Sequence, residues 1–314
     1  MSDVISFSHV PVLLQPVIDG LLTDPEGIYV DCTLGGGGHS EKIAQALRGK
    51  GRLICIDRDK DAIAIASQRL SPYSDRITFV HSNFSEIDTI LHDLGIEKIT
   101  GALADLGVSS YQLDTPMRGF SYQHDAPLDM RMDESAPFSA YQVINEYPEG
   151  ELLRILRDYG EERFASRIAR AITERRAVSP ITRTLELAEI VSSAVPAKFR
   201  NDGHPARRTF QAVRIEVNGE LDIIPGTAHS LISHLLPGGR VCIITFHSLE
   251  DRLVKEAFAE EAKGCTCPPD FPVCVCGKTP NVRILTKKPI TADETELGEN
   301  FRSHSAKLRI AEKL

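Results

Sequence analysis

The sequence lacks any long run of apolar residues. Its longest clear apolar strand, Val241 to Phe246, is far too short to cross a bilayer. Residues 1–9 contain neither a basic segment nor an apolar stretch, so we expect no signal peptide. These absences argue against a membrane-spanning or secreted protein, and we expect a cytoplasmic chain with no membrane partner.

The sequence also lacks the even set of cysteines that a disulfide framework requires. Three of its seven cysteines, Cys32, Cys55 and Cys242, stand inside apolar, strand-like runs. This pattern is typical of a reducing compartment, in which such thiols are structural. The hydrophobic fraction of 42% and the charged fraction of 25% are ordinary for a globular protein, so the bulk composition favours no particular function.

Strand-like runs alternate with helical patterns in the first hundred residues. Segments rich in Val, Ile and Leu predict four strands, at Ile28–Cys32, Arg52–Ile56, Ile77–His81 and Ile99–Leu106. Because the connections are short, we predict right-handed crossovers and a parallel, doubly wound α/β sheet. After a turn at Leu235–Arg240 the sheet resumes with a strand at Val241–Phe246. An antiparallel edge is predicted from Val282–Lys287 and Ala306–Ala311.

Residues 114–218 interrupt the sheet pattern with helices. Apolar side chains recur at helical spacing in Glu162–Arg176, Leu185–Ala194 and Ala206–Leu221. We therefore predict three parts: a first part of the sheet domain at 1–113, an all-helical insertion at 114–218, and a second part of the sheet domain at 219–314.

Positive charge gathers in this insertion, although the whole chain carries a net charge of −8. Residues 163–214 hold eleven Lys and Arg against four Asp and Glu, a net charge of +7, which leaves −15 for the rest of the chain. Such asymmetry is typical of a face that binds an anion such as nucleic acid, but a solvated helical surface has the same composition. The charge alone leaves both interpretations open.

A glycine-rich turn, Leu34-Gly35-Gly36-Gly37-Gly38-His39, follows the first strand. A strand that leads into such a turn and then a helix places backbone N–H groups beside a ligand that approaches closely. Asp57 ends the second strand, where its carboxylate can accept both hydroxyls of a ribose. The turn and Asp57 together predict a cofactor that contains adenosine, without saying which one.

Three other segments end strands of the same predicted sheet. Asn83 and Phe84 follow the third strand and either hold an adenine ring or, for Phe84, belong to the core. Asp105 ends the fourth strand beside the predicted switch point, where ligands of doubly wound sheets bind. We therefore expect Asp105 near the reacting groups. His247 and Ser248 follow the fifth strand and are either pocket residues or a helix cap with an incidental histidine.

A series of short blocks runs in order along nearly the whole chain. They are His9–Leu14, Thr33–Ser40, Ile56–Asp59, Asp105–Gln112, Arg118–Ser121, Pro127–Asp133, Tyr159–Arg163, Thr209–Asn218, Phe246–Arg252 and Arg302–Arg309. In these blocks the sequence resembles the bacterial MraW/RsmH family of 16S ribosomal RNA cytosine-N4 methyltransferases. The resemblance implies a Rossmann-like class I methyltransferase sheet, S-adenosylmethionine as methyl donor, and the decoding-centre cytidine of the small ribosomal subunit as substrate. The cofactor contacts that it implies are Gly37, Gly38, His39, Asp57, Phe84, Asp105 and Gln112.

The reaction that this resemblance implies needs orientation more than acid–base chemistry, because a sulfonium transfers its methyl group by in-line displacement. The N4 lone pair of cytosine is conjugated with the ring, so we hypothesise that Asp105 accepts an N4 hydrogen and turns the lone pair toward the methyl group. The target base must be unstacked. We expect phosphate contacts from Arg207, Arg208 and Arg214.

Four further cysteines form two close pairs, Cys265-x-Cys267 and Cys274-x-Cys276. They either hold a tetrahedral Zn²⁺ or are four reduced surface thiols, and the sequence leaves both possibilities open. Some members of the family have no cysteines in this region, so we expect catalysis not to depend on them and assign no metal ligand to the active site.

Two functions of other classes fit parts of the pattern. A noncatalytic ribosome assembly factor that only binds S-adenosylmethionine is disfavoured by the intact Asp57 and Asp105. A nicotinamide-dependent oxidoreductase is disfavoured by the contiguous glycines and by the lack of an obvious His or Tyr for hydride transfer.

Overall fold

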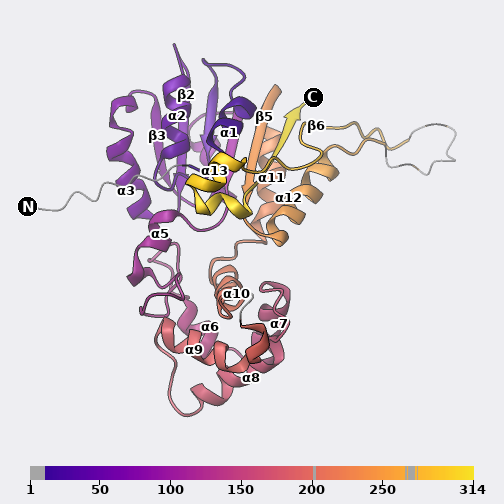
Figure 1. The fold of residues 1–314 in the computed structure, drawn as a ribbon. Helices are drawn as coiled ribbons and strands as arrows, with labels where there is room; N and C mark the ends of the chain where they lie inside the picture. Colours follow the sequence, from indigo (N-terminus) through magenta and orange to yellow (C-terminus); the bar gives the residue numbers. More distant parts are fainter. Residues whose placement is uncertain (1–10, 201–202, 266, 268–272, 274) are drawn as a thin grey trace, which may run out of the picture. The chain divides into compact units, whose positions relative to one another are not determined.

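The structure, a computed structural model, describes residues 11–200, 203–265, 267, 273 and 275–314. His9, Val10 and Cys274 therefore lie outside the described residues. The chain divides into two compact units (Figure 1), the sheet unit up to Gly107 with Asp222–Leu314, and the helical unit Val108–Leu221. The helical unit begins six residues before the predicted insertion and ends three residues after it. Within the described residues, no helix is long and apolar enough to cross a membrane.

The sheet unit is built on seven strands in the order β3-β2-β1-β4-β5-β7-β6. Their bounds are β1 Ile28–Asp31, β2 Arg52–Asp57, β3 Ile77–His81, β4 Ile99–Asp105, β5 Leu235–Thr245, β6 Val282–Ile284 and β7 Lys307–Lys313. The first five strands are parallel, and β7 pairs antiparallel with both β5 and β6. This arrangement confirms the predicted Rossmann-like sheet with an antiparallel edge.

Helices cover both faces of this sheet, which explains why β1, β2 and β4 are nearly continuous apolar runs. Helices α1 (Leu14–Leu21), α2 (Gly38–Ala46) and α3 (Lys60–Arg69) share one core with the strands. Helix α11 (Ile223–His234) packs against β5, α4 (Ile87–Asp93) and α12 (Ser248–Glu261). A short helix, α13 (Glu294–Glu299), precedes the last strand.

The predicted turn at Leu235–Arg240 is wrong as a boundary, because these residues lie inside β5. Leu235 pairs with Ile99 and Arg240 with Gly101, so five steps along β5 face only two along β4. The extra residues form an irregularity in the pairing, and Gly238 has a φ of +80°. The Pro and Gly residues of this segment therefore mark a bulge within a strand, and not a turn between two elements.

The helical unit contains α5 (Ser110–Asp114), α6 (Ala140–Glu146), α7 (Glu149–Asp158), α8 (Ala165–Arg176), α9 (Thr184–Ala194) and α10 (Arg207–Asn218). Its own core buries Ile168 and Ile172 of α8 and Phe210 and Val213 of α10, as their helical spacing predicts. The predicted third helix was too long at its carboxyl end, because Gly219 adopts a left-handed φ of +59° and ends α10. The described residues of this unit form no strand.

Candidate functional site

After the end of β1, the chain forms hydrogen bonds with both neighbouring strands, β4 and β2. The Cys32 N–H donates to Leu103 O of β4 at 2.8 Å, and the Leu34 N–H donates to Ile56 O of β2 at 3.0 Å. The following turn therefore lies across the carboxyl ends of three adjacent strands. This is the switch point of a doubly wound sheet, where ligands bind.

The glycines of the turn meet different requirements. Gly37 has a φ of +74°, which favours glycine, and α2 begins at the next residue. A Cβ on Gly38 would lie 2.3 Å from Cγ of Pro11, so this position is packed against the chain itself. A Cβ on Gly36 would meet no atom of the described residues within 4 Å. The Cα of Gly36 is thus open to close approach by a ligand, although its carbonyl oxygen accepts from Arg69 Nη1 at 3.4 Å.

Each of the three strands at the switch point ends in an aspartate: Asp31 on β1, Asp57 on β2 and Asp105 on β4. Asp57 accepts hydrogen bonds from the N–H groups of Gly35 at 2.8 Å and Asp59 at 2.9 Å, which fastens the glycine turn to β2. A carboxylate has about four acceptor positions, so Asp57 keeps capacity for ribose hydroxyls.

Asp31 and Thr33 connect the end of β1 to α2 and to β4. Asp31 accepts from the Ser40 hydroxyl at 2.6 Å and from the Thr33 N–H at 3.1 Å. The Thr33 hydroxyl in turn accepts from the Asp105 N–H at 2.6 Å. Thr33 was not predicted as a site residue, although it stands between the first aspartate and the glycines.

Asp105 has an unsatisfied oxygen. Its side chain is 25% exposed, yet Oδ1 is buried and finds no hydrogen-bond partner among the described residues. Oδ2 lies 3.7 Å from Nδ1 of His39, too far for a hydrogen bond. The other ring nitrogen of His39 lies 3.0 Å from Val12 O, so Nε2 carries the hydrogen and donates. Buried acceptors are rarely left unpaired, and Oδ1 is therefore available to a donor beyond the described residues.

The electrostatics at the carboxyl ends of β1, β2 and β4, which we call the acidic edge, favour a cation. Burial raises the pKa of Asp31 and of Asp57 to about 6. Burial, followed by the charges of Asp31 and Glu250, raises the pKa of Asp105 well above its usual value. For Asp31 and Asp57, the contribution to folding stability is complete below the ordinary value of 3.8 and is lost as pH rises through about 6. A bound cation offsets that loss, because it stabilises the charged carboxylates.

Glu250 is a buried acid that the sequence reasoning missed. It is 1% exposed and accepts from the N–H groups of Phe246 at 2.7 Å and His247 at 3.2 Å. His247, rather than Ser248, caps α12, because its Nδ1 accepts from the Glu250 N–H at 3.4 Å. Ser248, the cap that the sequence favours, is instead the first residue of α12. The reciprocal pattern of a cap and an acid three residues later was the available signal.

The remaining predicted cofactor contacts lie in different units. Phe84 begins a short 3-10 helix after β3 and is half-buried, outside the core that α1, α2 and α3 share. Its contact with an adenine ring stays a prediction. Gln112 belongs to the helical unit, where its side chain accepts from the Ser109 N–H at 3.1 Å and completes a capping box on α5. Its contact with a cofactor stays a prediction.

A model of the MraW methylase family matches residues 6–314. The chain belongs to this family. Ribosomal RNA small subunit methyltransferase H of Clostridium botulinum is 55% identical over 308 residues, which cover 98% of this chain and 99% of that protein. The protein of the same name from Lachnospira eligens is 53% identical over 315 residues and 100% of both chains. An rRNA methylase structure from Streptococcus thermophilus shares 11% identity, with coverage of 95% and 92% and a TM-score of 0.42. The family match confirms the resemblance seen in the sequence.

The three arginines predicted to contact phosphates differ in their exposure and in the contacts that they make within this MraW-family chain. Arg207 and Arg208 are exposed at the start of α10, and Arg208 donates to Glu161 O at 2.7 Å. Arg214 is only 19% exposed and forms an ion pair with the buried Glu220 at 2.9 Å. The structure therefore favours Arg207 and Arg208 over Arg214 as ligands for an external anion.

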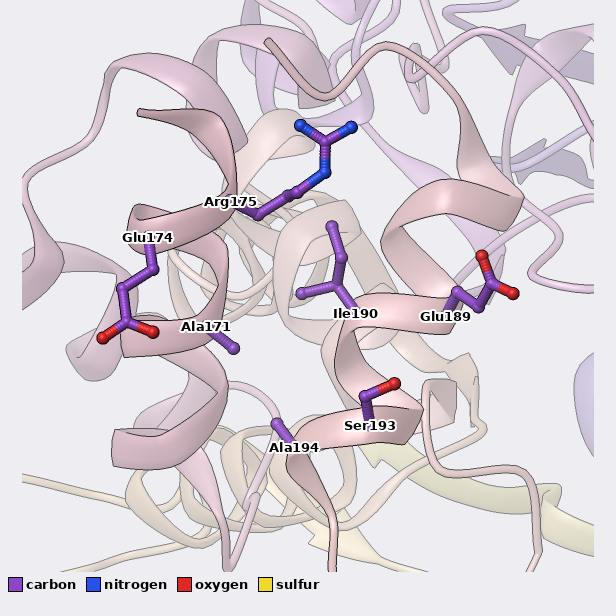
Figure 2. A pocket seen from close by; sticks show the side chains of 7 residues that line it. All are labelled: Ala171, Glu174, Arg175, Glu189, Ile190, Ser193 and Ala194. Atoms are coloured by element: carbon purple, nitrogen blue, oxygen red, sulfur yellow. The ribbon is translucent and has the colours of Figure 1, made fainter. Parts of the chain in front are cut away.

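A separate hollow lies between α8 and α9 of the helical unit (Figure 2). Two carboxylates, Glu174 and Glu189, stand among its lining residues, together with Arg175. The Arg175 guanidinium is 2.6 Å from a carboxylate oxygen of Glu186. This balance of charge does not favour an anionic ligand, and none of the predicted site residues lines the hollow.

The two neighbouring glycines of the turn provide a matched test. Gly37→Ala places a side chain at a φ of +74°, and we expect the free energy of unfolding to fall by about 1–2 kcal/mol. Gly36→Ala has room for its Cβ, so we expect a change within about 0.5 kcal/mol in the absence of ligand. Chemical denaturation measures both. Equal destabilisation by the two substitutions would contradict the described turn.

Proposed function

We propose that this chain transfers the methyl group of S-adenosylmethionine to N4 of a cytidine in 16S rRNA, at the decoding centre of the small ribosomal subunit. The observation that carries the proposal is the edge at which Asp31, Asp57 and Asp105 end adjacent strands beside an open glycine turn. Family membership supports methyl transfer, and relatives named for the small-subunit ribosomal RNA support the substrate. The resemblance noted in the sequence supports N4 of cytosine.

S-adenosylmethionine is the methyl donor, and the residues at the switch point fit it. The cofactor supplies a methyl group on a positively charged sulfur, and it also carries an ammonium group and an adenosine. Asp57 would accept hydrogen bonds from the ribose hydroxyls, and Phe84 would contact the adenine. Gly37, Gly38 and His39 would line the site beside the rest of the cofactor. The buried acids of this edge neutralise its positive charge.

Asp105 orients the amine that receives the methyl group. Oδ1, which has no partner among the described residues, accepts a hydrogen bond from the N4 amino group of cytosine. This hydrogen bond turns the lone pair of N4 out of conjugation with the ring and toward the methyl group. Positive charge develops on N4 during transfer, and a fixed carboxylate stabilises it. The Thr33 hydroxyl holds the Asp105 backbone in place for this role.

The helical unit holds the RNA. The residues that support this are Arg207 and Arg208, which are exposed in the segment that carries the excess of positive charge. Contacts to phosphates fix the register of the strand, and the cytidine is unstacked to enter the pocket. Arg214 contributes by holding α10 to Glu220.

Tritium transfer from labelled S-adenosylmethionine tests the proposal. We expect label in N4-methylcytidine from small-subunit particles or from naked 16S rRNA, and the comparison of the two identifies the substrate form. Binding of S-adenosylmethionine without any transfer would instead support a noncatalytic assembly factor. Label in another base or atom would contradict the proposed specificity.

The same assay tests Asp105. We expect Asp105→Asn to lower kcat by about 100-fold, because an amide cannot stabilise the charge on N4 as a carboxylate does. The control is Asp75→Asn, whose parent side chain is 70% exposed, and it should keep full activity. If Asp105→Asn retains full turnover, its role in orienting the amine is wrong.

The salt dependence of RNA binding tests the arginines. We expect the double variant Arg207→Gln, Arg208→Gln to reduce the slope of log affinity against log salt by about 1.5, because each lost phosphate contact removes about 0.7–0.9. Arg157→Gln is the control, since Arg157 is 66% exposed in the same unit and pairs with Asp158. A double variant with an unchanged slope would show that other residues contact the phosphates.

A further inference from the structure

The segment between α12 and β6 is long, and the residues of it that the structure describes form no regular element. Twenty residues, 262–281, separate Glu261 from Val282, and the described ones form no helix or strand. Two of its apolar side chains, Val273 and Val275, are 69% and 74% exposed, so they do not form a core for it. Loops of this length without their own structure are uncommon in compact domains.

The two ends of this segment are fastened together. Lys278 forms an ion pair with Glu260 at 2.6 Å. The Asn281 N–H donates to Glu261 O at 2.8 Å, and the Asn281 side-chain amide donates to the Glu261 carboxylate at 2.7 Å. These contacts close the base of the loop on the end of α12.

Three cysteine side chains meet in that outer part. The Sγ atoms of Cys265, Cys267 and Cys276 all lie within 4.8 Å of one another. The pair Cys265 and Cys276 is 3.7 Å apart. Two sulfurs bound to one tetrahedral Zn²⁺, each at about 2.3 Å, stand about 3.8 Å from each other. One edge of the triangle already has this length, and the others need to shorten by about 1 Å at most.

The surroundings of the sulfurs suit thiolates. The backbone N–H of Val275 points to Sγ of Cys267 at 3.4 Å, a contact that stabilises negative charge on sulfur. Cys265 and Cys276 are exposed and Cys267 is half-buried, so a metal ion and water both have access. The buried cysteines of the sheet differ, because burial raises the pKa of Cys242 to about 12 and keeps it a thiol.

We propose that Cys265, Cys267 and Cys276 bind a structural Zn²⁺ that holds the loop between α12 and β6. Soft thiolate ligands select zinc over the hard cations magnesium and calcium. Each thiol loses its proton to solvent as the metal binds, and the metal ties the two sides of the loop together. The three thiolates occupy three positions of the tetrahedron, and a water molecule completes it. Cys274, the fourth cysteine of the two sequence pairs, lies outside the described residues, and the proposal does not depend on it. The site is separate from the methyltransferase edge.

Metal analysis of the full-length chain, purified under reducing conditions from zinc-supplied cells, tests the proposal. We expect a single zinc ion per chain, and the Co²⁺-substituted protein should show the strong visible absorption of tetrahedral thiolate coordination. Cys265→Ser and Cys276→Ser should each weaken metal affinity by at least about 100-fold, since loss of even an outer partner costs 10–100-fold. Val275→Ser keeps the backbone contact and should bind zinc as the parent chain does.

Proteolysis gives a readout that does not depend on a variant. Chelation should speed cleavage within residues 262–281 and leave the remaining cleavage sites unaffected. The proposal is overturned if the reduced parent chain binds neither Zn²⁺ nor Co²⁺. It is equally overturned if Cys265→Ser or Cys276→Ser binds zinc as tightly as the parent chain, or if Cys265 and Cys276 form a disulfide in the purified protein.

Discussion

Carboxyl groups held at the ends of three adjacent strands set the conditions for the rest of the sheet unit. Asp57 fixes the glycine turn, Asp31 fixes the start of α2 through Ser40, and Asp105 is fixed through Thr33. Burial raises the pKa values of all three acids, and the hydrogen bonds donated to Asp31 and Asp57 offset only part of that rise, so a nearby cation would stabilise their charged forms. In the proposed site, the sulfonium of S-adenosylmethionine supplies this cation, and its binding then stabilises the charged acids that hold the turn.

In the proposed function, the chemistry and the recognition of the RNA substrate belong to different units of the chain. The sheet unit supplies the acids and the open backbone at Gly36, whereas the helical unit has its own core and carries the exposed Arg207 and Arg208. An insertion with an independent core can hold a large RNA without altering the strands that position the cofactor. The cysteine cluster adds a third feature, in the loop that follows α12.

Local patterns predicted most of the fold, and they failed where distant residues decide the conformation. Periodicity found the strands and α8 to α10, but the Pro and Gly of Leu235–Arg240 indicated a turn, because a bulge depends on the register with β4. Asp57 and Asp105 were visible as acids at strand ends. Glu250 was not, because its burial and its effect on Asp105 arise only when β5 lies beside β4. The ion pair that occupies Arg214 was equally invisible in a count of charges.

The affinity of S-adenosylmethionine as a function of pH tests this account most directly. Raising the pH through about 6 ionises Asp31 and Asp57, so calorimetry between pH 5 and pH 8 should show binding that tightens by at least about tenfold. S-adenosylhomocysteine, which lacks the sulfonium charge, should show a smaller increase. Affinity for S-adenosylmethionine that is constant or falls with rising pH, in protein that remains folded, would contradict the claim that these buried acids create the cofactor site.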